Sequence, residues 1–172
     1  MMGTIVACME DLVTKKFGAV KWKESLKNAG FSDARLFSTL EDVADAQVLA
    51  LMKGIADAGS LTMNQVMDAF GEHWSSQFAP KLYSSYFAAA KSTRELLLSL
   101  DKVHTSITRV MKSARPPHFT YEWQGDKHLV MHYQSGRGLI ALMPGLIHGL
   151  GTYYKDRPSV RIAGNAVHVE FA

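Results

Sequence analysis

His104 is the residue whose type and position first suggest chemistry. It follows Leu100 by four residues and precedes Ile107 by three, so it lies inside the apolar stripe of a predicted helix. A histidine in such a place is either a core residue with a satisfied ring or a neutral imidazole offered to a haem iron in an apolar cavity. Asp101, one turn earlier, or a backbone carbonyl could orient the ring, and the sequence leaves both open.

A second set of polar side chains, Tyr133, Ser135 and Arg137, alternates along the end of a predicted strand. At strand periodicity the three project to one side, where two hydroxyls and a planar guanidinium can converge on an oxyanion. Each charge-assisted hydrogen bond of this kind contributes about 1.5–3 kcal/mol. Taken alone, these three residues could equally form a structural hydrogen-bond network at the end of the strand. Together with His104 they supply what a haem needs, an axial donor and a clamp for the propionates, with methionines and aromatic residues as walls.

The other histidines offer no comparable metal site in the sequence. His128 and His132 are four residues apart, but on a strand that spacing spans about 13 Å, too far to share one ion. His118, His148 and His168 have no partner at a useful spacing. His-Glu-x-x-His, paired-cysteine and nucleophile-elbow patterns do not occur, so nothing in the sequence favours hydrolysis or phosphoryl transfer.

The elements that must position these residues are helical as far as the proline pair Pro116–Pro117, because apolar residues recur every three or four positions. The predicted helices cover the N-terminal segment up to Gly18, residues 22–29, 46–58 and 62–74, and a last helix whose apolar stripe runs from Leu96 to Met111 and which ends before Arg115–Pro116–Pro117. Capping boxes at Thr62–Gln65 and Ser92–Glu95 open the last two, and Pro80 is expected to break the chain between them.

Beyond the proline pair the apolar period changes from 3.6 to 2, which predicts strands. We expect one hairpin from residues 118–123 and 128–134, and another from residues 160–162 and 167–171. Residues 137–154 between them return to a helical pattern, with a kink expected at Pro144. The sequence therefore predicts a single domain over residues 1–172 with an α+β fold, in which an N-terminal helical block is followed by an antiparallel sheet with an intervening helix.

Composition and charge narrow the class of protein. The chain has 172 residues, 47% hydrophobic and 20% charged, which suits one globular domain. The net charge is +3, and the N-terminal lysines recur at helical spacing, which favours a solvated helix face over a nucleic-acid partner. No apolar run approaches the ~18 residues of a membrane span. We therefore expect no membrane partner. The single cysteine, Cys8, cannot form an internal disulfide, which favours a reducing compartment, so we expect a cytoplasmic protein.

Four segments together resemble the haem nitric oxide/oxygen binding (H-NOX) family, in its stand-alone bacterial form. This family is related to the sensor module of soluble guanylate cyclases, and the resemblance covers nearly the whole chain. The segments are the opening Met2–Val6, Asp101–His104, Arg115–Pro116–Pro117 and the motif Tyr133-x-Ser135-x-Arg137, which is the most specific of the four.

The resemblance implies a site for heme b (iron protoporphyrin IX). His104 would bind the iron from the proximal side, Tyr133, Ser135 and Arg137 would hold the propionates, and Pro117 would press on the porphyrin. The distal wall would consist of Ile5, Met9, Trp74, Phe119, Leu142 and Leu146.

The resemblance also implies which gas is bound. Oxygen-binding members carry a tyrosine at the position of Leu142, a tryptophan at that of Met9 and an asparagine at that of Trp74. Bound oxygen needs a hydrogen-bond donor, whereas nitric oxide and CO need one far less. The expected protein is therefore a nitric oxide sensor and no enzyme, and it would signal to a separate histidine kinase or diguanylate cyclase.

Two other readings of the residues remain. In one, the protein is a haem-free binding module whose apolar cavity and Arg137 hold an apolar carboxylate ligand. In the other it is a haem enzyme such as a peroxidase, although no distal acid–base pair is evident.

Overall fold

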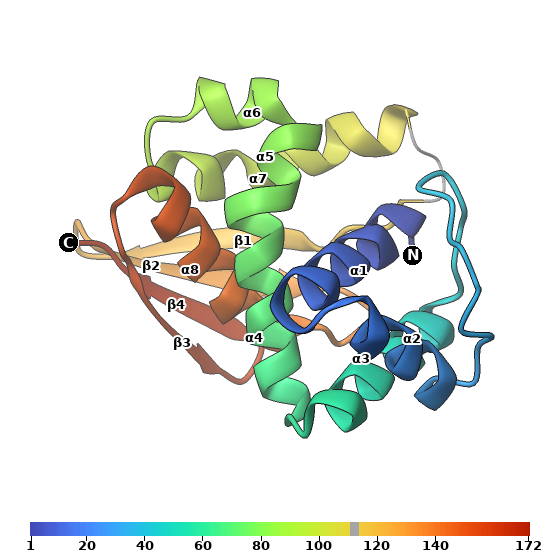
Figure 1. Ribbon diagram of the computed structural model, residues 1–172. Helices are drawn as coiled ribbons and strands as arrows, with labels where there is room; N and C mark the ends of the chain where they lie inside the picture. The colour runs from blue at the N-terminus through green and yellow to red at the C-terminus, as the bar shows by residue number, and fades with distance from the viewer. Residues whose placement is uncertain (111–113) are drawn as a thin grey trace. The chain divides into compact units, whose positions relative to one another are not determined.

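The computed structural model describes residues 1–110 and 114–172 and confirms the α+β fold class (Figure 1). The chain forms two compact units, Met1–Phe70 and Gly71–Ala172. Within the described ranges, none of the helices combines the length and the apolar character needed to cross a membrane.

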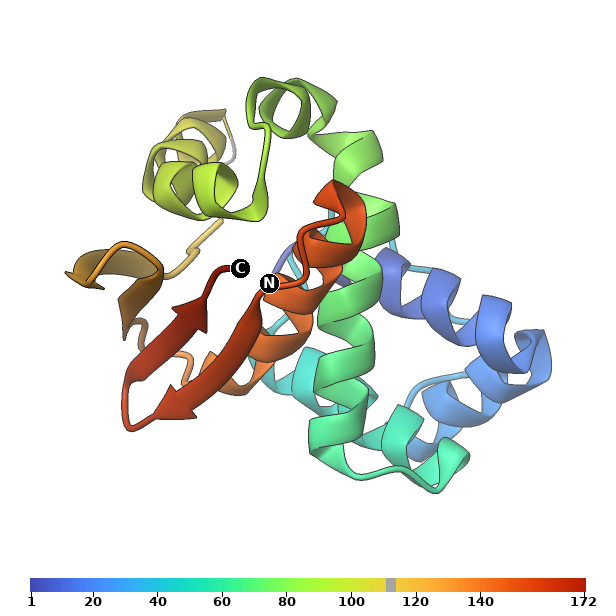
Figure 2. The same cartoon turned by 90° about the vertical axis from the view of Figure 1, so that its left-hand side faces the viewer.

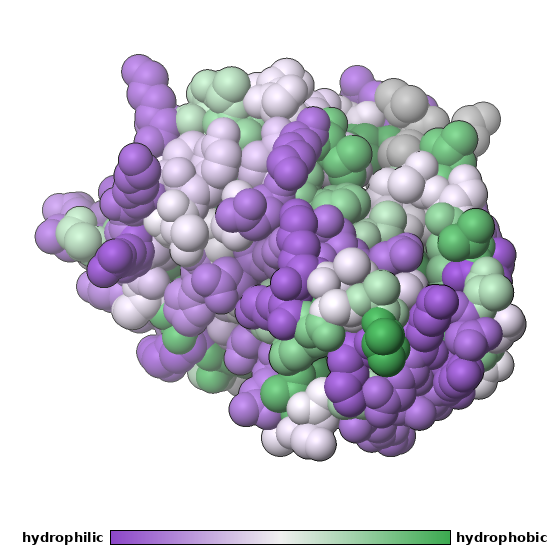
Figure 3. Space-filling view, viewed as in Figure 1, coloured by the Kyte–Doolittle hydropathy of each residue, from purple (hydrophilic) through white to green (hydrophobic). Residues whose placement is uncertain are grey.

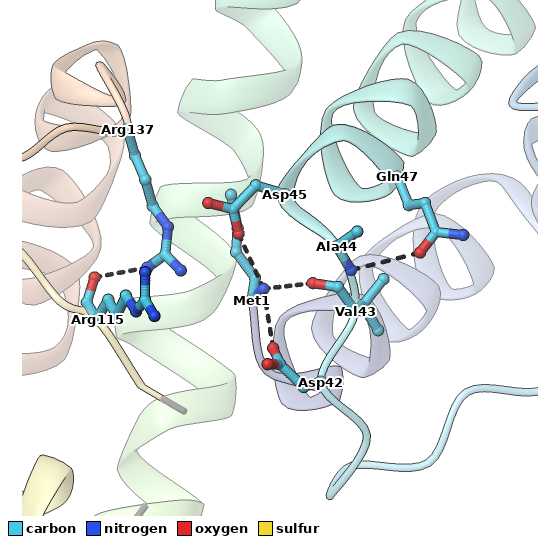
Figure 4. A network of polar contacts seen from close by, with 8 residues as sticks. All are labelled: Met1, Asp42, Val43, Ala44, Asp45, Gln47, Arg115 and Arg137. Carbon is cyan, nitrogen blue, oxygen red and sulfur yellow. Dashed lines mark hydrogen bonds and ion pairs between the residues drawn. The ribbon is translucent and has the colours of Figure 1, made fainter. Parts of the chain in front are cut away.

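The first unit is helical. It contains α1 (Gly3–Phe17), α2 (Ala19–Asn28), α3 (Asp45–Gly59) and the start of α4 (Met63–His73). The N-terminal ammonium group binds the Val43 carbonyl and the carboxylates of Asp45, at 2.9 Å, and Asp42, at 3.3 Å (Figure 4). The first residues are therefore part of the folded unit, as the sequence predicts.

The N-terminal lysines are exposed except Lys21, which is half-buried, and some form ion pairs on their own helices. Lys15 binds the Asp11 carboxylate and Lys21 that of Glu24, each at 2.8 Å. Figure 3 shows hydrophilic residues over much of the face in view, with hydrophobic ones between them. These pairs and exposures confirm the predicted solvated helix face.

The second unit begins inside α4, whose helical backbone continues into a π-helical turn, η1 (Trp74–Phe78), and then α5 (Ala79–Leu82), α6 (Ser84–Ala89) and α7 (Thr93–Val110). The expected break at Pro80 is wrong. Pro80 lies in the first turn of α5, directly after the π-helical turn. There the loss of its N–H is tolerated and the backbone stays helical.

Hydrogen bonds at the helix starts bear out both predicted caps, the second in altered form. Thr62 and Gln65 form the reciprocal box, with the Thr62 N–H donating to Oε1 at 2.8 Å and the Gln65 N–H to Oγ1 at 3.2 Å. Ser92 accepts from the Glu95 N–H at 3.2 Å, but the Glu95 carboxylate accepts from Lys91. The described part of α7 ends at Val110, and Met111 of the predicted stripe lies outside the described residues.

The strands of the second unit form one antiparallel sheet in the order β1-β2-β4-β3. The two predicted hairpins are confirmed as β1 (His118–Gln124) with β2 (His128–Gln134), and β3 (Ser159–Ala163) with β4 (Ala166–Glu170), the second being clear in Figure 2. A short 3-10 turn, η2 (Ile140–Leu142), and α8 (Met143–Tyr154) lie between β2 and β3. Pro144 lies in the first turn of α8, where its fixed backbone angle suits a helix start, so the expected kink is wrong.

Alternation along the strands gives the sheet two different faces. Residues of one face belong to the core of the second unit, where Leu129, Met131 and Val167 are fully buried together with Ile147 of α8. The opposite face is polar and carries several histidines. The residues of β2 alternate between the two faces, so this one strand carries both core residues and residues of the polar face.

A close backbone contact joins α8 to the end of α4 and η1. A Cβ atom at Gly149 would lie 2.6 Å from the Glu72 carbonyl oxygen and 2.9 Å from Cβ of Ser75. A Cβ at Gly136 would meet nothing within 4 Å.

We predict that Gly149→Ala lowers the free energy of unfolding by about 1–3 kcal/mol, because backbone atoms must shift to admit the methyl group. Urea denaturation would measure the loss. Gly136→Ala is the matched control and is expected to change stability little. Equal stability of the two variants would contradict the close contact.

Candidate functional site

His104 is held by a single backbone carbonyl. Its Nδ1 lies 3.1 Å from the carbonyl oxygen of Pro117. Because a carbonyl oxygen only accepts, Nδ1 carries the hydrogen and donates it, which leaves the lone pair on Nε2. Of the two orienting groups that the sequence leaves open, the structure therefore selects the carbonyl. Asp101 instead lies with Oδ1 3.1 Å from Nδ1 of His118.

Burial keeps the His104 imidazole neutral. Desolvation lowers the pKa of His104 below its usual value, and the Pro117 hydrogen bond and the Asp101 charge oppose this only in part. A neutral ring with its proton fixed on Nδ1 presents Nε2 as an electron-pair donor. This is the state in which histidine binds a metal.

Aromatic rings continue from His104 toward the strand end. The ring centroid of Phe119, on β1, lies 6.4 Å from that of His104 and 5.9 Å from that of Tyr133. Phe119 and Tyr133 are paired across β1 and β2. Leu100 and Ile107 on α7 are half-buried apolar neighbours of His104 in the sequence stripe. His104 therefore lies in apolar and aromatic surroundings, as its position in the stripe indicates.

The three residues of the Tyr-x-Ser-x-Arg motif lie at the end of β2 and in the segment that follows, and all are half-buried. Ser135 Oγ accepts a hydrogen bond of 3.2 Å from the Arg137 N–H. The Arg137 guanidinium donates to the carbonyl oxygen of Arg115 at 2.5 Å (Figure 4). Arg115 is followed by the proline pair that ends with the carbonyl holding His104. The structure thus connects Arg137 and His104 through a segment of three residues.

The remaining predicted site residues fall in both units. Trp74 is half-buried in the π-helical turn and stacks on Phe78, with centroids 5.7 Å apart. Leu142 ends η2, and Leu146 on α8 packs, like Trp74, against the core of the second unit. The other two, Ile5 and Met9, lie on α1 in the first unit, where Met9 is fully buried and Ile5 half-buried.

One pair of polar side chains was missed by the sequence analysis. His128 Nε2 lies 3.0 Å from His168 Nδ1, so the expectation that His168 has no partner at a useful spacing is wrong. The antiparallel register of β2 and β4 pairs His128 with Glu170 and Val130 with His168, which makes the two histidines diagonal neighbours. Only this register, and no local spacing, could have revealed the pair. In the described ranges, no three metal-binding side chains come together.

Comparisons with known proteins agree with this geometry. Residues 2–162 match the family described as Haem-NO-binding. Soluble guanylate cyclase gcy-37 of Caenorhabditis elegans is 24% identical over 151 residues, which cover 86% of this chain but only 21% of the cyclase. The chain is also similar to two solved structures at 25% identity. One is a variant of the T. tengcongensis H-NOX protein (TM-score 0.87; 99% of this chain and 97% of that chain). The other is the oxygen complex of an oxygen-binding H-NOX domain related to soluble guanylate cyclases (TM-score 0.82; 99% and 95%).

Cys8 lies on α1 between Ile5 and Met9 and is fully buried. Burial, and secondly the negative charge of Asp11, raises the pKa of its thiol well above the usual value. Since only the thiolate reacts, the thiol should be inert in the folded protein.

We predict that iodoacetamide at pH 8 alkylates Cys8 of the folded protein at least about 100-fold more slowly than in the unfolded protein, because each pKa unit removes a factor of about ten in thiolate. Mass spectrometry would follow the reaction, with the same protein in guanidinium chloride as the control. Equal rates in the two states would show that this thiol is accessible and ionised.

Proposed function

The chain belongs to the haem-NO-binding, or H-NOX, family, and on this premise we propose that residues 1–172 form one sensor domain for nitric oxide. The family consists of haem-binding gas-sensor domains related to soluble guanylate cyclase. Beyond the family, we propose which residues bind the haem, which gas binds to it and which kind of protein receives the signal.

The state of His104 is the observation that supports the proposal most strongly. A neutral imidazole with Nδ1–H given to the Pro117 carbonyl has the donor chemistry of an axial haem ligand, and the surrounding side chains are apolar. These residues therefore fit a haem, which we take to be heme b. When bound, it would supply an iron on which a diatomic gas can coordinate.

Tyr133, Ser135 and Arg137 are our proposed anchors for the propionates. A guanidinium has five donors in a fixed fork, so Arg137 can keep its hydrogen bond to Arg115 and still bind a carboxylate. The same contact holds the proline segment in place. We propose that Pro117 fulfils two roles there, pressing on the porphyrin through its ring and orienting His104 through its carbonyl.

Selectivity for nitric oxide and CO over oxygen is proposed from the side chains assigned to the distal side. Leu142, Leu146 and Phe119 are apolar and cannot donate to a bound oxygen molecule. Trp74 is stacked on Phe78 and is half-buried, which suits a space-filling role. Ile5 and Met9 are assigned to this wall by the resemblance alone.

The chain spans 21% of the length of the guanylate cyclase it matches, so we do not attribute the cyclase activity of that protein to this chain. We propose that the domain itself catalyses no reaction and passes its signal to a separate histidine kinase or diguanylate cyclase. The cytoplasmic location expected from the sequence stays a prediction.

Absorption spectroscopy tests the proposed function directly. The purified or haem-reconstituted protein should show a Soret band, and after reduction its spectrum should change with nitric oxide or CO but stay unchanged in air before oxidation. A colourless protein that cannot be reconstituted would favour the haem-free carboxylate-binding alternative. Rapid peroxide turnover would favour a haem enzyme.

We predict that His104→Gly abolishes haem retention, because the variant lacks the axial donor, and that millimolar imidazole restores it. The haem-to-protein ratio after gel filtration would measure both effects. His118→Gly is the control, since this exposed histidine bonds to Asp101 and should not alter haem content. Unchanged haem in the His104 variant would refute the assignment of the ligand.

We predict that Leu142→Tyr raises the oxygen affinity of the reduced protein at least about tenfold, enough to introduce an oxygen complex that the parent protein does not form in air, because one new hydrogen bond of about 1.4 kcal/mol corresponds to a factor of ten. Stopped-flow spectroscopy would compare this variant with Leu142→Phe, which adds the ring without the hydroxyl. Identical oxygen kinetics in the two variants would show that position 142 does not face the gas.

A further inference from the structure

We propose that His128 and His168, on the polar face of the sheet, form a binding site for a divalent copper ion. This site is separate from the residues assigned to haem, and the proposal does not rest on the proposed function. It rests on the distance between two ring nitrogens, on the side chains around them and on the strands that carry them.

The two imidazoles converge from neighbouring strands. His128 Nε2 and His168 Nδ1 are 3.0 Å apart, and the ring centroids are 5.1 Å apart. His128 and His168 lie on the paired strands β2 and β4, and this pairing fixes the distance between their Cα atoms. The sheet therefore presents two ring nitrogens at a set spacing. In the structure they share a hydrogen bond, so an ion that binds both must replace the proton between them.

The type of donor selects the kind of ion. Two imidazole nitrogens completed by water form a nitrogen and oxygen ligand set, which Cu²⁺ and Ni²⁺ accept in a square arrangement. Cu²⁺ binds such sites more tightly than the other divalent ions of its row.

A carboxylate is placed to support His128 from behind. Glu170 Oε2 lies 3.9 Å from Nδ1 of His128, the nitrogen that would not bind the metal. Because His168 Nδ1 accepts from Arg161, the proton between the two rings lies on His128 Nε2. Once an ion replaces that proton, His128 would carry its hydrogen on Nδ1, facing this carboxylate. Carboxylates commonly support metal-bound histidines in this way.

A competing cation lies on the other side of the pair. Nη2 of Arg161 is 3.2 Å from Nδ1 of His168 and donates to the lone pair that the ion would use. Copper binding must displace this guanidinium, whose positive charge also repels the ion. Removal of the Arg161 charge should therefore tighten copper binding, an effect that a purely structural pair of histidines would not produce.

The remaining coordination positions would be filled by water, since the described residues bring no third metal-binding side chain to the pair. A further histidine on this face, His132, is engaged with Glu122, its Nε2 lying 3.4 Å from Oε2. His132 serves as the matched control, because it is exposed on the same strand face but lies outside the pair.

The position of the site gives the ion a way to act on the rest of the second unit. A bound ion would tie β2 to β4, and β2 continues to Tyr133. The Tyr133 N–H already donates to the Asn165 carbonyl, in the turn that precedes β4, at 2.8 Å. Copper on the polar face would thus restrain the strand that carries Tyr133, the first residue of the Tyr-x-Ser-x-Arg motif.

Isothermal titration of the full chain with Cu²⁺ at pH 7.5, in a weakly coordinating buffer, tests the site. We expect one ion per chain, and an electron paramagnetic resonance spectrum showing coupling to two imidazole nitrogens. His128→Ala and His168→Ala should each weaken binding at least tenfold, and His132→Ala should leave it unchanged. Arg161→Gln should strengthen it several-fold. Circular dichroism would confirm that each variant is folded.

Two results would overturn the proposal. One is a wild-type protein that binds no Cu²⁺ at this pH. The other is binding that survives in the folded double variant His128→Ala/His168→Ala, which would place the ion elsewhere on the chain. A Glu170→Gln variant with threefold or greater loss of affinity would support the role of the carboxylate, and an unchanged affinity would remove Glu170 from the site.

Discussion

The hydrogen bond from His104 to the Pro117 carbonyl is the contact on which the candidate haem site depends. It fixes which nitrogen carries the proton and ties α7 to the start of β1. Arg137 binds the Arg115 carbonyl two residues earlier, so the end of β2 is tied to the same short segment. A proline pair suits this position because its backbone is stiff and its carbonyls have no competing helical donors. Three elements therefore meet at one stretch of chain, which sets the relative positions of the imidazole and the guanidinium.

β2 links this site to the polar surface of the sheet. Its alternate residues face the core and the solvent, so one strand carries Leu129 and Met131 on one side and His128 and His132 on the other. Tyr133 continues the core-facing series and pairs with Phe119. The first residue of the motif therefore belongs to the same hydrogen-bonded ladder as the histidines of the polar face.

The sequence predicted those parts of the structure that depend on local spacing. His104 in an apolar stripe, the alternation of Tyr133 and Arg137 and the two hairpins all follow from periods of 3.6 and 2. The predictions at Pro80 and Pro144 were wrong because the local sequence does not show whether a proline lies inside a helix, which it breaks, or in the first turn, where it is tolerated. The orienting group of His104 and the pairing of His128 with His168 could not be predicted. Both are contacts between residues that are distant in the sequence, and no local pattern encodes such contacts.

One buried contact decides how α7 can respond to events at His104. The N–H and hydroxyl of Thr93 both bind the Asp156 carboxylate, each at 2.7 Å, and Thr93 is fully buried. This attaches the first turn of α7 to the residues just after α8. His104 lies three turns further along the same helix. A displacement of the imidazole that reached α8 through α7 would therefore have to pass through this one buried pair.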